Sequence, residues 1–136
     1  MKSEIFSQFD QTQTIYLSTF DGKYPRVRPV TLICNDDEFF IATGSEDAKV
    51  AQLRDRNEIE FCYSLKKDDT GGYIRGAGAT EFVTDNGTRK RVFDIIPFLK
   101  QFFKTAEDEG FCLIRVILKE IEYMKPGEHL ATKYKI

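Results

Sequence analysis

The stretch that decides the fold runs from Thr14 to Thr43 and reads TIYLSTFDGKYPRVRPVTLICNDDEFFIAT. It contains three alternating apolar segments, which are separated by the short polar turns Asp21-Gly22 and Asn35-Asp36-Asp37. Asp-Gly between two alternating runs is a strong hairpin signal. The stretch therefore predicts three antiparallel strands joined by tight turns, at 14–20, 25–34 and 38–43.

Outside this stretch the chain is also mostly strands. A short helix is expected before it, and two further helices are expected to interrupt the strands after it. Strand alternation returns over 58–65, 73–84 and 111–123. Helical periodicity is expected over 3–11, 44–57 and 88–103, with a break or kink at Pro97 and a tail from Met124 onward. Six hairpin-connected strands and about three peripheral helices predict a mainly β (α+β) fold, a closed or half-closed antiparallel barrel in which residues 1–136 form one domain.

Composition limits the classes of function. Lys and Arg number 20 and Asp and Glu number 22 among 136 residues, so the net charge of -2 argues against non-specific nucleic-acid binding. Apolar runs reach only about five residues, against the roughly 20 of a membrane helix. The first residues lack the apolar core of a signal peptide, which makes the cytoplasm the expected location.

The cysteines do not suggest a metal site. Cys34, Cys62 and Cys112 are widely spaced and form no Cys-x-x-Cys pair, and His129 is the single histidine. A zinc site needs more closely spaced ligands than these. We therefore expect no metal, and we expect the three cysteines to be buried or half-buried small apolar residues.

A candidate phosphate site lies between Thr43 and Lys49. A strand ends there in Ala42-Thr43-Gly44-Ser45, and a helix is expected to begin at Gly44 or Ser45. The first turn of a helix offers unpaired N–H groups, to which Thr43 adds a hydroxyl and Lys49 a positive charge. An ordinary serine cap followed by a solvated lysine would produce the same pattern, so both interpretations stay open.

A second signal is the segment Arg26-Val27-Arg28-Pro29-Val30. In a strand, Arg26, Arg28 and Val30 share one face, and two arginines that line a barrel are costly unless an anion meets them. Pro29 removes a ladder donor, which predicts a bulge or a sheet edge. A solvent-exposed basic face is the alternative. The hairpin order places this strand alongside Thr43, and a groove of this kind fits a phosphorylated planar cofactor.

Two further features predict packing rather than chemistry. Gly76-Ala77-Gly78 lies inside a strand rather than before a helix, so it indicates a bulge or a close backbone approach and not a dinucleotide loop. Phe98, Phe102 and Phe103 have helical spacing and are expected in the core or at a subunit contact. A load of 12 Phe and 6 Tyr exceeds what a small barrel can bury, which predicts a homodimer formed through the barrel face and this Phe-rich helix.

Taken in order, these segments resemble the pyridoxamine 5′-phosphate oxidase-like FMN-binding split-barrel family, in particular its small general-stress-protein and nitroimidazole-reductase-like members. The resemblance covers about residues 12–125. It is carried by Tyr16-Leu17-Ser18-Thr19, Asp21-Gly22, Pro25 to Val30, Phe39 to Gly44, Ala48-Lys49-Val50 and Arg75 to Ala79.

The resemblance implies a split β-barrel and a homodimer with FMN in a groove at the dimer interface. The segment from Arg26 through Val27, Arg28, Pro29 and Val30 to Thr31 would then run along the flavin ring. Ala42 and Thr43 would contact the phosphate end, and Lys49 would be the last residue of the family's Ser-Arg-Lys phosphate clamp.

Several positions depart from the family pattern. The clamp reads Asp47-Ala48-Lys49, without its arginine, and Gly71 or Gly72 stands near the place of a family glutamine. Residues 124–136 contain no arginine, although the true vitamin B6 oxidases carry one in a C-terminal substrate motif. The histidine of the nitroimidazole reductases has no counterpart near the groove. Vitamin B6 oxidation is therefore not predicted.

Two classes of function remain after the resemblance is considered. The first is an FMN-dependent oxidoreductase that acts on an unknown small molecule, with no catalytic residue predicted because the flavin itself carries the electrons. The second is a non-catalytic flavin- or haem-binding split-barrel protein with a stress or storage role. A purely structural or interaction domain is a further alternative.

Overall fold

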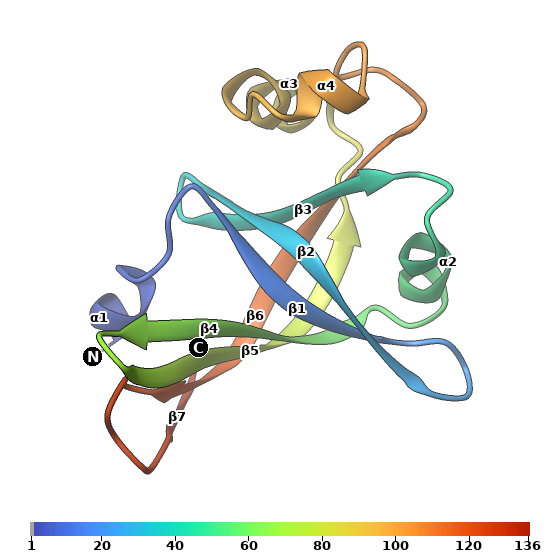
Figure 1. Ribbon diagram of the computed structural model, residues 1–136. Helices are drawn as coiled ribbons and strands as arrows, with labels where there is room; N and C mark the ends of the chain where they lie inside the picture. Colours follow the sequence, from blue (N-terminus) through green and yellow to red (C-terminus); the bar gives the residue numbers. More distant parts are fainter. Residues whose placement is uncertain (1) are drawn as a thin grey trace.

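The stretch from Thr14 to Thr43 forms a three-stranded meander, as predicted, and the rest of the chain closes it into a barrel (Figure 1). The computed structural model describes residues 2–136. Its sheet has seven strands in the order β3-β2-β1-β4-β5-β6-β7, and all neighbours are antiparallel. The strands are β1 (Thr12–Phe20), β2 (Pro25–Asn35), β3 (Glu38–Gly44), β4 (Glu58–Lys67), β5 (Thr70–Phe82), β6 (Phe111–Met124) and β7 (Thr132–Lys135).

A second pairing of β3 makes the sheet a barrel. Beyond its hairpin with β2, β3 pairs with β6 in an unbroken register from Phe39↔Val116 to Gly44↔Phe111. Two strands at distant places in the sequence are therefore joined, and most of the sheet's hydrogen-bonding edge is removed. The prediction of a mainly β, antiparallel split barrel is confirmed.

Four helices lie outside the sheet: α1 (Lys2–Phe6), α2 (Ala48–Asp55), α3 (Asn86–Ile95) and α4 (Leu99–Phe102). The predicted break at Pro97 is confirmed, since it separates α3 from α4. The predicted start of α2 is wrong. The helix is capped by Asp47 rather than by Gly44 or Ser45, because the Asp47 carboxylate accepts a hydrogen bond from the Lys49 amide.

The C-terminal segment differs from the prediction of a tail. Residues Thr132–Lys135 form β7, which pairs with β6 from Glu120↔Lys135 to Tyr123↔Thr132. The segment is polar and short, so its sequence carries little strand signal. It forms a strand because the long β6 continues past the barrel and offers it a free edge.

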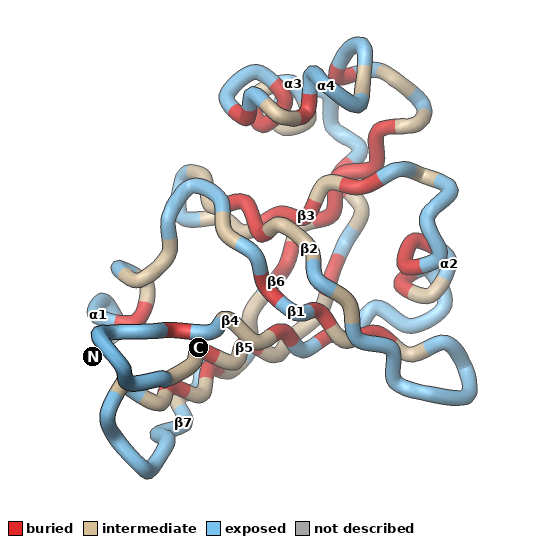
Figure 2. The backbone as a smooth tube through the Cα atoms, viewed as in Figure 1, coloured by how far each residue is buried: buried red, intermediate tan, exposed pale blue. Residues whose placement is uncertain are grey.

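Apolar side chains form three clusters. Figure 2 marks in red the buried residues along the backbone. The first fills the barrel and includes Leu17, Leu32 and Ile41, with Val50 and Leu53 of α2 packed against it. The second lies between α3, α4 and the outer surface of β3, and the third lies under α1. Helix α2 therefore covers one end of the barrel, because its narrow apolar stripe belongs to the barrel core.

The glycines of β5 sit where a side chain would collide with its neighbours. A Cβ at Gly76 would lie 2.7 Å from the ring of Phe61. At Gly78 it would overlap the carbonyl oxygen of Ile117, beside a register shift between Ala77 and Gly78. The interpretation of these glycines as a bulge and a close approach is confirmed.

The cysteines follow the sequence prediction, and the Phe-rich region follows it for two of its three phenylalanines. Cys34 and Cys62 are half-buried, Cys112 is buried, and all three are free thiols. Phe98 and Phe103 pack against the cluster under α3 and α4, whereas the Phe102 side chain is 71% exposed. Among the helices of residues 2–136, none is long and apolar enough to cross a membrane.

Candidate functional site

The two arginines of β2 share a face, as predicted. Arg28 is paired with Leu17 and Val30 with Ile15 across the β1–β2 ladder, and both partners are fully buried. Directly opposed residues of an antiparallel pair point to the same side of the sheet. Arg26, Arg28 and Val30 therefore belong to the inner face of the barrel.

The alternate residues of the same segment face outward. Val27 is 67% exposed and Pro29 is also exposed. The β1–β2 register is continuous past Pro29, while β2 pairs with β3 only through Leu32 to Asn35. Pro29 therefore lies on a free edge of the sheet. Of the two predicted alternatives, a bulge or a sheet edge, the structure has the sheet edge.

Arg28 lies at the α2 end of the barrel, in a polar cluster. Its Nη2 donates to Thr19 Oγ1 at 2.8 Å and to Gln52 Oε1 at 3.0 Å. Its Nη1 is buried and has no hydrogen-bond partner among the described residues. Burial lowers the pKa of the guanidinium, and the charge of Asp47 opposes that shift. Arg28 thus carries an unused donor in a partly desolvated position.

Lys49 forms the second half of the cluster. Its ammonium donates to Thr43 Oγ1 at 2.8 Å and lies 2.9 Å from Asp47 Oδ1, with the residue only 6% exposed. Burial would raise the pKa of Asp47, but hydrogen bonds from the amide and ammonium of Lys49 outweigh it, so the pKa is lowered. The Asp47 carboxylate therefore occupies the place at the start of α2 where the sequence predicted an external anion.

Five of the expected site residues lie outside this cluster: Val27, Pro29 and Val30 of β2, and also Arg26 and Ala42. The Arg26 Nε is 2.6 Å from Asp21 Oδ2 in the β1–β2 turn, and its guanidinium lies over the Tyr24 ring. The pKa of Asp21 is lowered to about 2 by hydrogen bonds from the Tyr24 amide, the Arg26 side chain and the Lys23 amide. Ala42 packs against the cluster under α3 and α4, on the opposite face from Thr43.

The structure thus brings together Arg28, Thr43 and Lys49 and adds three groups that the sequence interpretation did not assign to the site. Thr19 alternates with Ile15 and Leu17 and so was placed on the inner face, but its hydroxyl gave no functional signal. Gln52 lies one turn after Lys49 on α2. In the sequence, Asp47 indicates only a departure from a phosphate clamp. We define the α2 cluster as Thr19, Arg28, Thr43, Asp47, Lys49 and Gln52.

The charges of the α2 cluster favour an anion. Arg28 and Lys49 are positive and Asp47 is negative, which leaves one net positive charge in a mostly buried setting. Two of the three ammonium N–H groups of Lys49 are engaged, so one can donate further. A shallow depression of about 300 Å³ includes Thr19 but no other residue of the α2 cluster, and its charged lining residues are Arg56, Glu58 and Glu60.

A larger cavity lies at the other end of the barrel and contains none of the expected site residues. It has a volume of about 730 Å³ and is lined by residues of α1, the β2–β3 turn and β6. Among residues 2–136, no three His, Cys, Asp or Glu side chains are gathered so that they could hold a metal ion. The α2 cluster and this cavity are therefore two separate places of interest.

Comparison with known proteins identifies the relatives of this arrangement. Residues 1–125 match the family model described as pyridoxamine 5′-phosphate oxidase. A search of the curated proteins gives no match.

Solved structures with the same fold come from several bacteria. General stress protein 26 from Bacillus anthracis superposes with a TM-score of 0.79 at 18% identity, covering 99% of this chain and 98% of that one. A NimC/NimA family protein from Clostridium acetobutylicum gives 0.80 at 16%, covering 98% and 91%. A heme binding protein from Mycobacterium smegmatis gives 0.76 at 11%, covering 92% of this chain and 53% of that one. At these identities the likeness concerns the fold.

Proposed function

The chain belongs to the pyridoxamine 5′-phosphate oxidase family, and on that premise we propose that it is a cytoplasmic FMN-binding flavoprotein. We further propose that it is an oxidoreductase for a small molecule. The observation that carries this proposal is the α2 cluster, in which Arg28 keeps a buried donor that has no partner among the described residues. An anionic oxygen of the cofactor would satisfy that donor.

The residues of the α2 cluster fit a phosphate. Lys49 would donate its remaining N–H, Thr43 would turn its hydroxyl toward the anion, and Arg28 would supply a second charge. Asp47 works against this arrangement because it already neutralises Lys49 at 2.9 Å. The net charge of the cluster nevertheless stays positive, so a dianion is attracted overall.

The expected contact with the flavin ring rests on β2. Its segment from Arg26 to Thr31 has no β3 partner, so its backbone groups on that side are free to meet a planar ring. When bound, FMN supplies the electron transfer, and the protein has to bind and orient it. Arg28, whose positive charge is half-buried, would favour the reduced and more negative flavin.

A homodimer is part of the proposal. The outer face of β1 and β2 exposes Tyr16 and Val27, and α4 exposes Phe102. Apolar surface of this kind favours association. We expect two copies to meet along this face and to complete the groove beside β2. Sedimentation at micromolar concentration should report a dimer, and a flavin-loaded monomer would contradict this part of the proposal.

The cofactor is tested first by the visible spectrum of the purified protein and of its released chromophore. Equilibrium titration should then show FMN binding far more tightly than riboflavin, which lacks the phosphate. Charge-assisted bonds contribute about 1.5–3 kcal/mol each, so Lys49→Ala should weaken FMN roughly ten- to a hundredfold and barely change riboflavin. Equal affinities for FMN and riboflavin in the wild type would mean that the phosphate adds nothing to binding, which would contradict a phosphate site at the α2 cluster.

The second candidate is a flavin- or haem-binding protein without turnover, with a stress or storage role. The observation in its favour is that one structure of the same fold is a heme binding protein. A haem spectrum would support it over FMN. With flavin bound, steady oxidation of a nicotinamide reductant in the presence of an electron acceptor would support the enzyme instead.

A further inference from the structure

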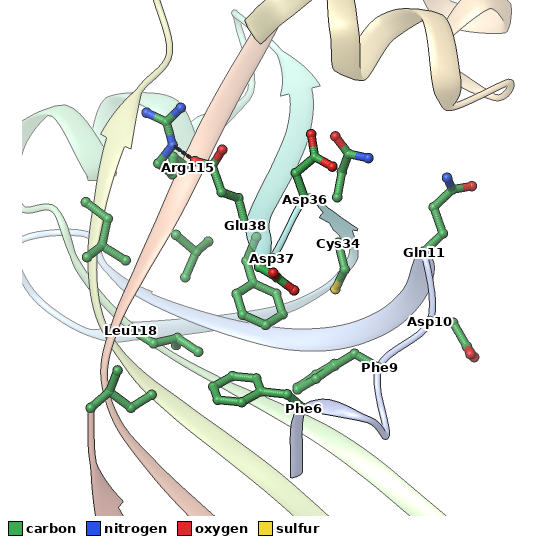
Figure 3. Close-up of a pocket in the computed structure, with 15 residues that line it drawn as sticks. Phe6, Phe9, Asp10, Gln11, Cys34, Asp36, Asp37, Glu38, Arg115 and Leu118 are labelled. Carbon is green, nitrogen blue, oxygen red and sulfur yellow. Dashed lines mark hydrogen bonds and ion pairs between the residues drawn. The ribbon is translucent and has the colours of Figure 1, made fainter. Parts of the chain in front are cut away.

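The cavity at the end of the barrel opposite α2 has the size of a small-molecule site. Its volume of about 730 Å³ compares with roughly 300–1,000 Å³ for ligand pockets. Figure 3 shows Phe6 and Phe9 on one side of it, with Asp36, Asp37 and Glu38 of the β2–β3 turn region across from them. We call it the turn-end cavity.

Aromatic rings form much of its wall. Phe6, Phe9 and Phe39 are half-buried, so part of each ring remains open. The Phe9 and Phe39 rings meet edge to face with their centroids 5.2 Å apart, and Phe9 is stacked on Tyr63 at 5.3 Å. These contacts hold the rings in place. An apolar or aromatic ligand body would be buried against them, and their faces also attract cations.

The charges around the cavity are unbalanced toward the negative side. Its acidic lining residues are Asp10, Asp36, Asp37 and Glu38, and its single basic one is Arg115. The Arg115 guanidinium is already engaged, at 2.6 Å from both Glu38 and Glu81. Asp36 has only a 3.8 Å contact with Arg91. Among the described side chains, no cation lies within ion-pair distance of Asp10 or Asp37.

The side chains of Asn35 and Cys34 also favour a cationic ligand over an anionic one. The Asn35 side-chain oxygen is buried at the cavity wall and has no hydrogen-bond partner among the described residues. Burial raises the pKa of the Cys34 thiol to about 11, a hydrogen bond from Gln13 opposes the shift, and the charge of Asp10 adds to it. The cavity therefore offers acceptors and negative charge, and its thiol is neutral at pH 7.

We propose that the turn-end cavity binds a small organic cation, an amine carried on an aromatic or aliphatic body. The body would lie against Phe6, Phe9 and Phe39, and the ammonium would face Asp37. Asp10, whose side chain is directed away from the rings in Figure 3, would add negative charge at the rim. The proposal does not rest on FMN binding, since a phosphate would be repelled by this acidic lining and attracted to the α2 cluster.

Three ligands with one body test the charge preference. They are 1-naphthylmethylamine, 1-naphthalenemethanol and 1-naphthylacetate, which are cationic, neutral and anionic at pH 7. The chain has no Trp, so the naphthalene fluorescence can be followed in titrations of the full chain. At low salt the amine should bind about tenfold more tightly than the alcohol, and the acetate should bind weakest. NMR shift changes should centre on Phe9, Phe39 and Leu118.

Aspartate-to-asparagine variants locate the charge. Asp37 has φ of 61°, a conformation that Asn also accepts, so Asp37→Asn should keep the turn. Combined with Asp10→Asn, it should weaken the amine by about tenfold and leave the alcohol unchanged. Asp68→Asn is the matched control, because Asp68 also has positive φ, at 56°, and does not line the cavity.

The results that would overturn the proposal are distinct. They are equal binding of the amine and the alcohol, loss of amine binding in Asp68→Asn to the same degree, or shift changes that map elsewhere. The proposal also fails if none of the three ligands binds. If sedimentation and NMR then show that a second copy covers Phe6 and Phe9, the cavity is an interface. None of these outcomes bears on the FMN titration.

Discussion

The two ends of the barrel can be compared through two thiols, the half-buried Cys34 and the buried Cys112. Burial raises the pKa of both Cys34, near the β2–β3 turn, and Cys112, which is paired with Thr43 near α2. At Cys34 the charge of Asp10 adds to the increase. At Cys112 the charges of Arg54, Arg89 and Lys49 all oppose it. The charges beside the two thiols are therefore negative at one end of the barrel and positive at the other.

This difference shows why the net charge of the chain says little about its ligands. The formal charge is only -2, yet β2 begins with Arg26 and Arg28 and is followed by Asp36 and Asp37. A strand advances about 3.3 Å per residue, so the eight residue steps from Arg28 to Asp36 separate these groups by about 26 Å in the direction of β2, and Arg26 lies farther away still. One end is suited to an anion and the other to a cation.

The strongest way to break the comparison is to remove the positive charge of the α2 end. Arg28→Gln should weaken FMN roughly ten- to a hundredfold, because it deletes a partly buried, charge-assisted donor. Arg26→Gln is the matched control. Its guanidinium is an exposed partner of Asp21, so we expect less than about a fivefold change. Titration with FMN measures both, and equal losses would show that the two arginines act together.

A smaller effect should sharpen the contrast by making the α2 end more positive. Asn is as good a helix cap as Asp, so Asp47→Asn should keep α2 while freeing Lys49 from its ion pair. FMN should then bind about three- to tenfold more tightly. Weaker FMN binding in this variant would mean that Asp47 positions Lys49 for the cofactor rather than competing with it.

The same substitution has a pH signature in the apo protein. The pKa of Asp47 is lowered in the folded state, so its ion pair contributes stability above the unfolded value of about 3.9. That contribution is lost as the pH falls through the lower, folded value. The free energy of unfolding of the wild type, measured with denaturant, should therefore decrease as the pH falls through this acidic range. In Asp47→Asn this part of the dependence should be absent.

The smallest expected effect is on the thiols themselves. Alkylation followed by mass spectrometry against pH should show Cys34 ionising near pH 11. Between these two thiols, Asp10→Asn should lower the pKa of Cys34 alone, and Lys49→Met should raise the pKa of Cys112 alone. Because the folded pKa of Cys34 is raised, its contribution to stability should be lost as the pH rises from about 9 to 11. Equal responses of both thiols would contradict the comparison.

Sequence reasoning reached the elements whose signals are local. Alternation and the turn chemistry of Asp21-Gly22 specified the meander, Pro97 separated two helices, and the glycines of β5 marked a bulge and a close approach. It also placed Arg28 on the inner face beside Thr43 and Lys49, because a strand's period of two residues assigns each side chain to a face. The family resemblance rested on these same segments, and the family match agrees with it.

The partners of those side chains were decided by the tertiary structure. Arg26 and Arg28 look alike in sequence, but one meets Asp21 in a turn and the other meets Gln52 of α2. Asp47 proved to be the cap and ion-pair partner of Lys49, and β7 formed on an edge that only the length of β6 provides.

By itself, the sequence determined the first six strands, their turns and the face on which each of their residues lies, because these depend on residues within a few positions of one another. The closure of β3 on β6, the separation of the two arginines and the turn-end cavity with its acidic lining depend on segments far apart in the chain. Such contacts form only when the barrel closes, so only the tertiary structure could decide them.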